Sequence, residues 1–200
     1  MCVAALFLGG CAYSAAPVST PAFDTALSYS DKIPGKWVLA VDLDKFSETV
    51  RPSGYACAIH SYPLDVRQSY QSALNQTLQN VFESVEVVDR PPTAEQLKEM
   101  NAKGSIFVRA EAMSGRVDVL PGFWSANMRS RVELVSAVLV DGPSGRLFGK
   151  TVEGDGEGEE SAGLVCSGGA KSLAAAAEDA MKDNVRGIAE TLGNAPNLRK

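Results

Sequence analysis

Two long segments of the chain carry apolar residues at every third or fourth position, and they limit the folds that it can adopt. In residues 65–85 the repeat consists of Val66, Tyr70, Leu74, Leu78, Val81, Phe82 and Val85. In residues 167–193 it consists of Leu173, Ala177, Met181, Val185, Ile188 and Leu192. This spacing places the apolar side chains on one face of an α-helix. We therefore expect two long amphipathic helices, each of which needs an apolar surface to cover.

The stretches between and around these helices have the alternation that is typical of half-buried strands. We predict strands in 37–43, 55–60, 86–89, 105–119, 123–140 and 146–152. The segment Asp141-Gly142-Pro143-Ser144-Gly145 suits a hairpin connection. In contrast, residues 153–160 alternate acids with glycine and are expected to form a solvated loop, with calcium binding as the weaker alternative.

A third, short helix is expected after the first long one. Thr93 and Gln96 have the spacing of a capping box, and Gly104 is a suitable stop. The expected fold is therefore α+β. It is a two-layer sandwich in which an antiparallel-rich mixed sheet is packed by two long amphipathic helices and one short helix.

The N-terminal residues resemble a bacterial lipobox. Leu8-Gly9-Gly10-Cys11 follows an apolar stretch, and in such signals the peptide is cut before the cysteine, whose thiol carries lipid. Residues 1–10 hold no Lys or Arg and are short for a signal peptide, so we expect the natural start codon to lie upstream. The alternative is a buried N-terminal element that happens to end in cysteine.

The segment after Cys11 is rich in Ser, Ala, Pro and Thr, which is typical of a flexible tether. We therefore predict a signal-peptide remnant in 1–10, a lipidated cysteine and tether in 11–35, and one globular domain in 36–200. No segment approaches the roughly 18 apolar residues of a membrane-spanning helix. Lipid on Cys11 is therefore the expected membrane link.

The four cysteines then divide into two groups. Cys2 would leave with the signal peptide and Cys11 would be lipidated, so that Cys57 and Cys166 remain as a pair. In an oxidising compartment such a pair favours a disulfide, and the alternative is two separate buried thiols. We expect a Cα separation of roughly 4.4–6.8 Å, because the two cysteines precede the two long helices.

Catalytic and metal-binding patterns are not found in the sequence. His60 is the only histidine, and a hydrolase would have to use it with a serine such as Ser61. No G-x-S-x-G motif is present, and the cysteine spacing does not suit zinc. The net charge of −5 gives no basic surface for nucleic acid. We expect no catalytic residue, no metal and no cofactor.

Phe123 and Trp124 are the strongest candidates for a contact surface. They follow Leu120-Pro121-Gly122 at an expected loop tip. Exposed aromatic residues there would contact a partner protein or a bilayer. The alternative, that both rings fold back over the core, carries equal weight.

In the lipobox, the tether and the order of its elements, the chain resembles small proteobacterial envelope lipoproteins. This group includes YajG-type lipoproteins, auxiliary lipoproteins of ABC-type lipid transporters and the lipoprotein partner of the lipopolysaccharide translocon. The resemblance implies a non-catalytic accessory that binds an envelope protein, and Ala12 after Cys11 implies sorting to the outer membrane, facing the periplasm. The alternatives are a carrier that holds a lipid or other amphiphile between helices and sheet, and a hydrolase that uses His60.

Overall fold

The computed structural model describes residues 13–14, 31–54, 57–122, 126–163 and 166–199. The strands are β1 (Tyr13–Ser14), β2 (Ile33–Asp42), β3 (Ser47–Val50), β4 (Pro52–Ser53), β5 (His60–Asp65), β6 (Phe82–Val88), β7 (Gly104–Pro121), β8 (Ala126–Gly142) and β9 (Gly145–Ser161). The helices are α1 (Arg67–Val81), α2 (Ala94–Glu99), α3 (Gly168–Gly193) and the short 3-10 helix η1 (Pro196–Leu198).

One mixed sheet of six strands forms the body of the molecule. Its order is β6-β2-β7-β8-β9, and β4 pairs with β7 beside this path. The strands β6, β2 and β7 are parallel to one another, whereas β7, β8 and β9 form a long antiparallel meander. A second, small sheet has the order β1-β5-β3. The expected α+β class with an antiparallel-rich mixed sheet is confirmed.

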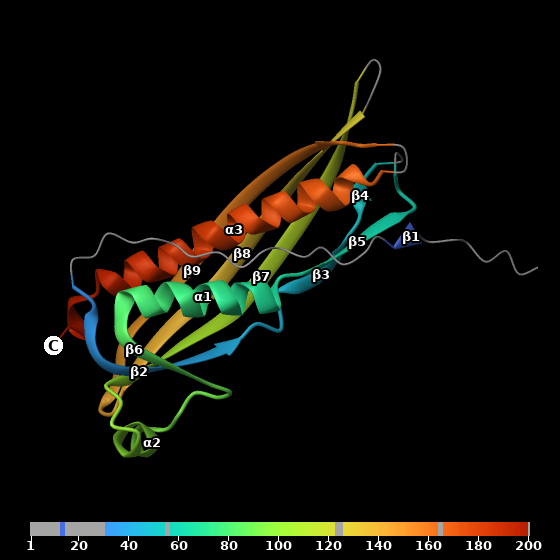
Figure 1. The fold of residues 1–200 in the computed structure, drawn as a ribbon. Helices are drawn as coiled ribbons and strands as arrows, with labels where there is room; N and C mark the ends of the chain where they lie inside the picture. The colour runs from blue at the N-terminus through green and yellow to red at the C-terminus, as the bar shows by residue number, and fades with distance from the viewer. Residues whose placement is uncertain (1–12, 15–30, 55–56, 123–125, 164–165, 200) are drawn as a thin grey trace, which may run out of the picture.

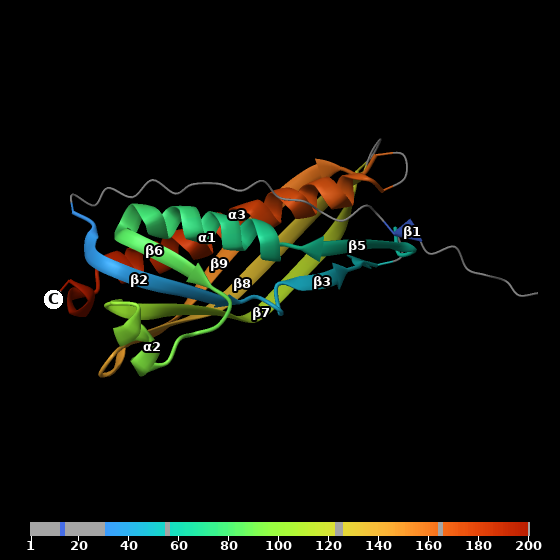
Figure 2. The same cartoon turned by 60° about the horizontal axis from the view of Figure 1, so that its bottom comes forward.

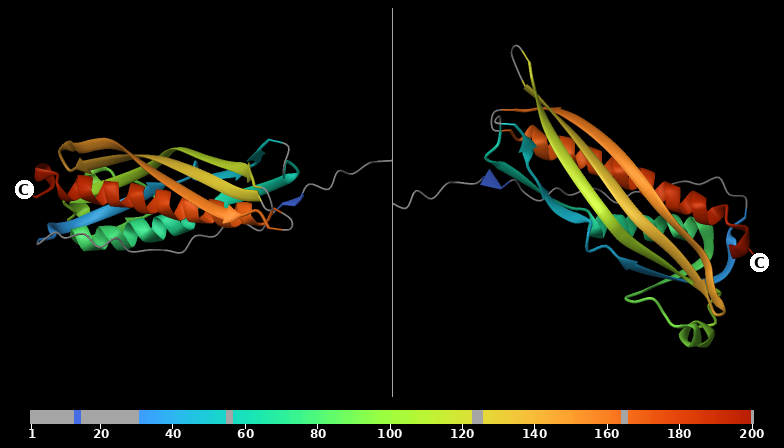
Figure 3. Two further views of the ribbon diagram at one scale, coloured as in Figure 1. Left: turned by 90° about the horizontal axis from the view of Figure 1, so that it is seen from above. Right: turned by 180° about the vertical axis from the view of Figure 1, so that it is seen from behind.

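Both long helices lie on the same side of the long strands (Figures 1 and 3). Their apolar faces and the facing strand residues form one continuous core that includes Trp37, Leu74, Leu134 and Ile188. The short helix α2 lies on the other side of β2 (Figure 2), where Leu97 and Ala102 cover Val38. Since β2 is thus buried on both faces, the two-layer arrangement stays a prediction for the molecule as a whole.

The first long helix is shorter than its apolar repeat predicts. It ends at Val81, and Phe82 already has extended backbone angles, with φ −111° and ψ 151°. The last predicted helical residue, Val85, instead pairs with Trp37 in the sheet. The valine-rich run in 84–88 favours a strand, and pairing with β2 decides the outcome. The capping box at Thr93 and Gln96 is present as predicted, but Asn101 rather than Gly104 takes the positive φ after α2.

Residues 153–160 form part of β9, and the prediction of a solvated acidic loop is wrong. The acids alternate with Gly154, Gly156 and Gly158, and a Cβ added to any of these glycines would point at α3. Glycine therefore takes the place of the apolar residue in the usual strand alternation. The start of the domain also differs, because β2 begins at the fully buried Ile33, inside the segment assigned to the tether.

Candidate functional site

The candidate site is one end of the elongated molecule, which we call the β5 end. It comprises β1, the start of β5, the Cys57–Cys166 disulfide, the N-terminus of α3, and the ends of β7 and β8 at Pro121 and Ala126. In the ribbon, β1, β5 and the N-terminus of α3 lie at this end of the molecule, and the ends of β7 and β8 project beyond them (Figures 1, 2 and 3). The described strand β1 pairs in parallel with β5, with Tyr13 opposite His60 and Ser14 opposite Ser61.

A disulfide between Cys57 and Cys166 joins the loop before β5 to the start of α3. The two Cα atoms are 6.0 Å apart, within the expected range, and the cysteines are 109 positions apart in the sequence. The backbone φ is 61° at Cys57 and 56° at Cys166. L-residues rarely adopt such positive values. This conformation places Cys57 in a turn and not in the strand predicted for 55–60, of which residues 55–56 lie outside the described residues.

Tyr62 of β5 is hydrogen-bonded to the backbone of one of the two disulfide cysteines. Its hydroxyl donates a hydrogen bond of 2.7 Å to the carbonyl oxygen of Cys166. Gly169 allows this approach, because a Cβ there would lie 2.5 Å from the Cζ of Tyr62. The backbone N–H of His60 donates to the carbonyl of Cys57, 2.9 Å away. The two half-cystines are therefore each held by a neighbouring residue of β5.

His60 has a packing role at this end. Its side chain is 7 % exposed, and its ring stacks on Tyr62 with centroids 6.4 Å apart. Ser61, the serine considered with it, is half-buried and pairs with Ser14. Within the described parts of the chain, no group of three or more metal-ligating side chains is found. In the same ranges no helix is both long and apolar enough to cross a bilayer.

Three other predicted site residues cannot be placed. Cys11 lies two residues before Tyr13, and Phe123 and Trp124 follow the end of β7, but all three are outside the described residues. Leu120, three residues before Phe123 and near the end of β7, is an exposed large hydrophobic residue. Their roles in lipidation and contact stay predictions.

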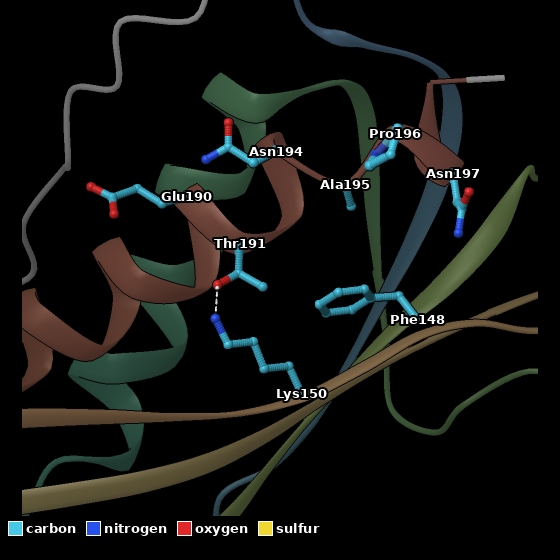
Figure 4. A pocket seen from close by; sticks show the side chains of 8 residues that line it. All are labelled: Phe148, Lys150, Glu190, Thr191, Asn194, Ala195, Pro196 and Asn197. Carbon is cyan, nitrogen blue, oxygen red and sulfur yellow. Dashed lines mark hydrogen bonds between the residues drawn. The ribbon is translucent and has the colours of Figure 1, made fainter.

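The opposite end of the molecule, which we call the η1 end, carries a surface cavity of about 550 Å³ (Figure 4). It lies between β9 and the last turn of α3, and the Phe148 ring forms one wall. The Lys150 side chain reaches across from β9 to the hydroxyl of Thr191, 3.4 Å away. A second cavity of about 400 Å³ on the other side of η1 is lined by Trp37 and Leu198. Sequence reasoning missed both cavities, because their walls come from residues far apart in the chain.

Comparisons with known proteins place the chain among distant structural neighbours. No protein-family model and no curated protein matches it. The solved structure of XCC0632 from Xanthomonas campestris, described with the family model DUF330, has a TM-score of 0.41 and 11 % identity, covering 90 % of this chain and 96 % of that one. The hypothetical protein CT253 from Chlamydia trachomatis has a TM-score of 0.45 and 8 % identity, covering 80 % and 98 %. These two structures give the chain no function.

Proposed function

We propose that the protein is a non-catalytic accessory of bacterial envelope assembly or transport, anchored by lipid on Cys11 and facing the periplasm, with the outer membrane as its expected location. The observation that carries this proposal is the lipobox-like Leu8-Gly9-Gly10-Cys11. Its cysteine lies two residues before β1, which pairs with the body of the molecule at the β5 end. The lipid would therefore attach to a structured end of the domain.

The disulfide supports a location outside the cytoplasm. Disulfides persist in oxidising compartments such as the bacterial periplasm and are rare where thiols are kept reduced. The bond joins Cys57 to Cys166 across more than half of the chain. This support is independent of the N-terminal residues.

The η1 end is the surface proposed for the envelope partner. Helix α3 has 26 residues. A helix of this length spans about 39 Å, which carries it from the β5 end to the η1 end. The two cavities there share Asn197 and combine apolar walls with Lys150, Asn194 and other polar groups. A mixed surface of this kind is typical of contacts between proteins that also exist apart.

Two alternatives receive less support from the described residues. A carrier would need space between helices and sheet, but a Cβ on Gly156 or Gly158 would lie only 2.0–2.1 Å from carbonyl oxygens of α3. A hydrolase would need an accessible His60, and its side chain is nearly covered. An accessory that works through its surface needs neither feature.

Replacement of Cys11 by serine tests the proposed anchor. We expect Cys11→Ser to move the protein from the membrane fraction to the aqueous fraction and to abolish labelling by radioactive palmitate, because lipid is the proposed membrane link. The matched control is Cys2→Ser, which changes a residue of the proposed signal peptide and should leave both readings unchanged. A Cys11→Ser protein that stays membrane-bound at high salt, with a wild type that takes up no fatty acid, would overturn the proposal.

A further inference from the structure

The position of β1 limits how the domain can lie on a membrane. Cys11 is two residues before Tyr13 in the sequence. Two residues of extended chain span at most about 7 Å. Tyr13 and Ser14 pair with His60 and Ser61 at the β5 end. A lipid on Cys11 therefore keeps this end close to the headgroups, whereas an unpaired tether would let the domain turn freely.

Exposed apolar side chains lie at the same end. Among the described residues, the large hydrophobic side chains that are exposed are Ile59 at 68 %, Val87 at 42 % and Leu120 at 37 %. Ile59 directly precedes β5, and Leu120 lies near the end of β7, so that two of the three belong to the β5 end. Apolar side chains that are costly in water are stabilised when they enter the bilayer interface.

The charged residues near this end are mostly paired with one another. Arg129 forms an ion pair with Glu159, Arg131 with Glu157, and Arg116 with Asp118, at N–O distances of 2.8–3.0 Å. The first two pairs join β8 to β9 and offset Glu159 and Glu157, whereas the third lies within β7. The exposed Glu160, beside them in β9, takes part in none of the ion pairs found among the described residues.

We propose that the β5 end is the membrane-facing end of the protein, with Ile59 and Leu120 in contact with the lipid bilayer that holds the anchor. This inference rests on the proposed lipidation of Cys11 and adds a fixed orientation to it. The disulfide holds the Ile59 turn in place, and the long axis of α3 directs the η1 end away from the bilayer. The domain then presents its two cavities to the periplasmic side.

Fluorescence quenching on vesicles tests the orientation. The lipidated protein is reconstituted into phosphatidylethanolamine–phosphatidylglycerol vesicles that contain nitroxide-labelled lipid, and a fluorophore is attached to Leu120→Cys or to Ser144→Cys. Ser144 is exposed and lies in the hairpin turn at the far end of β8, which has 17 residues. A strand of this length spans about 55 Å. We expect several-fold stronger quenching at position 120 than at position 144.

A second measurement needs no substitution near the disulfide. Amide hydrogen exchange is compared between the lipidated protein on vesicles and the Cys11→Ser protein in solution, and peptides that contain Ile59 are expected to exchange more slowly on vesicles. Peptides from the β8–β9 hairpin around Ser144 should be unchanged.

The outcomes separate the two proposals. If palmitate labels Cys11 but position 144 is quenched as strongly as position 120, or neither is quenched, the orientation is wrong and the anchor stands. Unchanged exchange at Ile59 in a palmitate-labelled protein would also overturn the orientation. If Cys11 carries no lipid, both proposals fail.

Discussion

At the scale of single residues, Asn184 of α3 is the centre of a buried hydrogen-bond network. Its Oδ1 accepts hydrogen bonds from the hydroxyls of Tyr70 and Ser136, and its Nδ2 donates to the carbonyls of Val152 and Leu134. The side chain is fully buried, and all four of its hydrogen-bonding positions are used. Burial also raises the pKa of Tyr70, so that its hydroxyl remains protonated and continues to donate.

Asn184→Ala should be strongly destabilising. It removes the partner that Tyr70, Ser136, Leu134 and Val152 share at a fully buried position, and we expect a loss of about 2–4 kcal/mol in the free energy of unfolding. Tyr70→Phe is the comparison, because it removes one hydroxyl and should cost about 1 kcal/mol. Urea unfolding of both variants in a Cys11→Ser background measures the difference. Equal losses would show that the amide has no central role.

At the scale of elements, the contact between α3 and β9 is made by backbone and small side chains. A Cβ on Gly158, Gly156 or Gly154 would lie within 2.0–2.4 Å of the carbonyl oxygens of Ser172, Ala176 and Ala180. The residues of α3 in this contact are four positions apart, and the glycines of β9 are two apart. We call this contact the glycine seam.

Gly156→Ala tests the glycine seam. The added methyl would meet the carbonyl oxygen of Ala176 at 2.0 Å. A helix backbone yields less readily than a side chain, so we expect a loss of about 1–3 kcal/mol or more. Gly149→Ala in the same strand is the matched control, because its Cβ would have an ordinary contact of 3.5 Å with Leu139. Denaturant unfolding compares them. The seam would lose its proposed importance if both variants were equally stable.

Both long helices and the capping box could be predicted because their signals lie within one turn or one periodic face. The strand at 153–160 could not, because glycine has no side chain to show that it is buried. The sequence does contain one signal for this contact. Glycine recurs every second residue at Gly154, Gly156 and Gly158, and small residues recur every fourth residue in the helix, as at Ala176 and Ala180. That match spans two distant segments, and reading it requires knowing that they pack together.

At the scale of the whole molecule, the disulfide is the covalent link between its two halves. It closes a loop of 109 positions between Cys57 and Cys166. The pairing could be anticipated, because each cysteine precedes a long helix and the two helices share one face of the sheet. The docking of Tyr13 and Ser14 on β5 could not, because a two-residue strand leaves no periodic pattern in a segment rich in small residues.

Cys166→Ser should lower the melting temperature. The chain-entropy model gives up to about 5 kcal/mol for a loop of this length, and a domain of this size loses about 2–4 °C per kcal/mol. We expect the melting temperature to fall by several degrees. Reductant should lower the melting temperature of the Cys11→Ser protein but not that of the protein that also carries Cys166→Ser. Thermal unfolding with and without reductant measures both. Two titratable thiols in the denatured, unreduced Cys11→Ser protein would contradict the bond.

The glycine seam has a consequence for how α3 finds its place along β9. Two strand residues advance about 6.7 Å and four helix residues about 6.0 Å, so the two repeats nearly coincide. If α3 shifted along β9 by four residues, small residues would again lie over glycines. The glycine seam alone therefore favours the observed register only weakly over the shifted one. Asn184 fits in only one of them, and the disulfide at Cys166 fixes the other end of the helix. The register of α3 on β9 is therefore set by Asn184 and by the disulfide, and the glycine seam only permits the close approach.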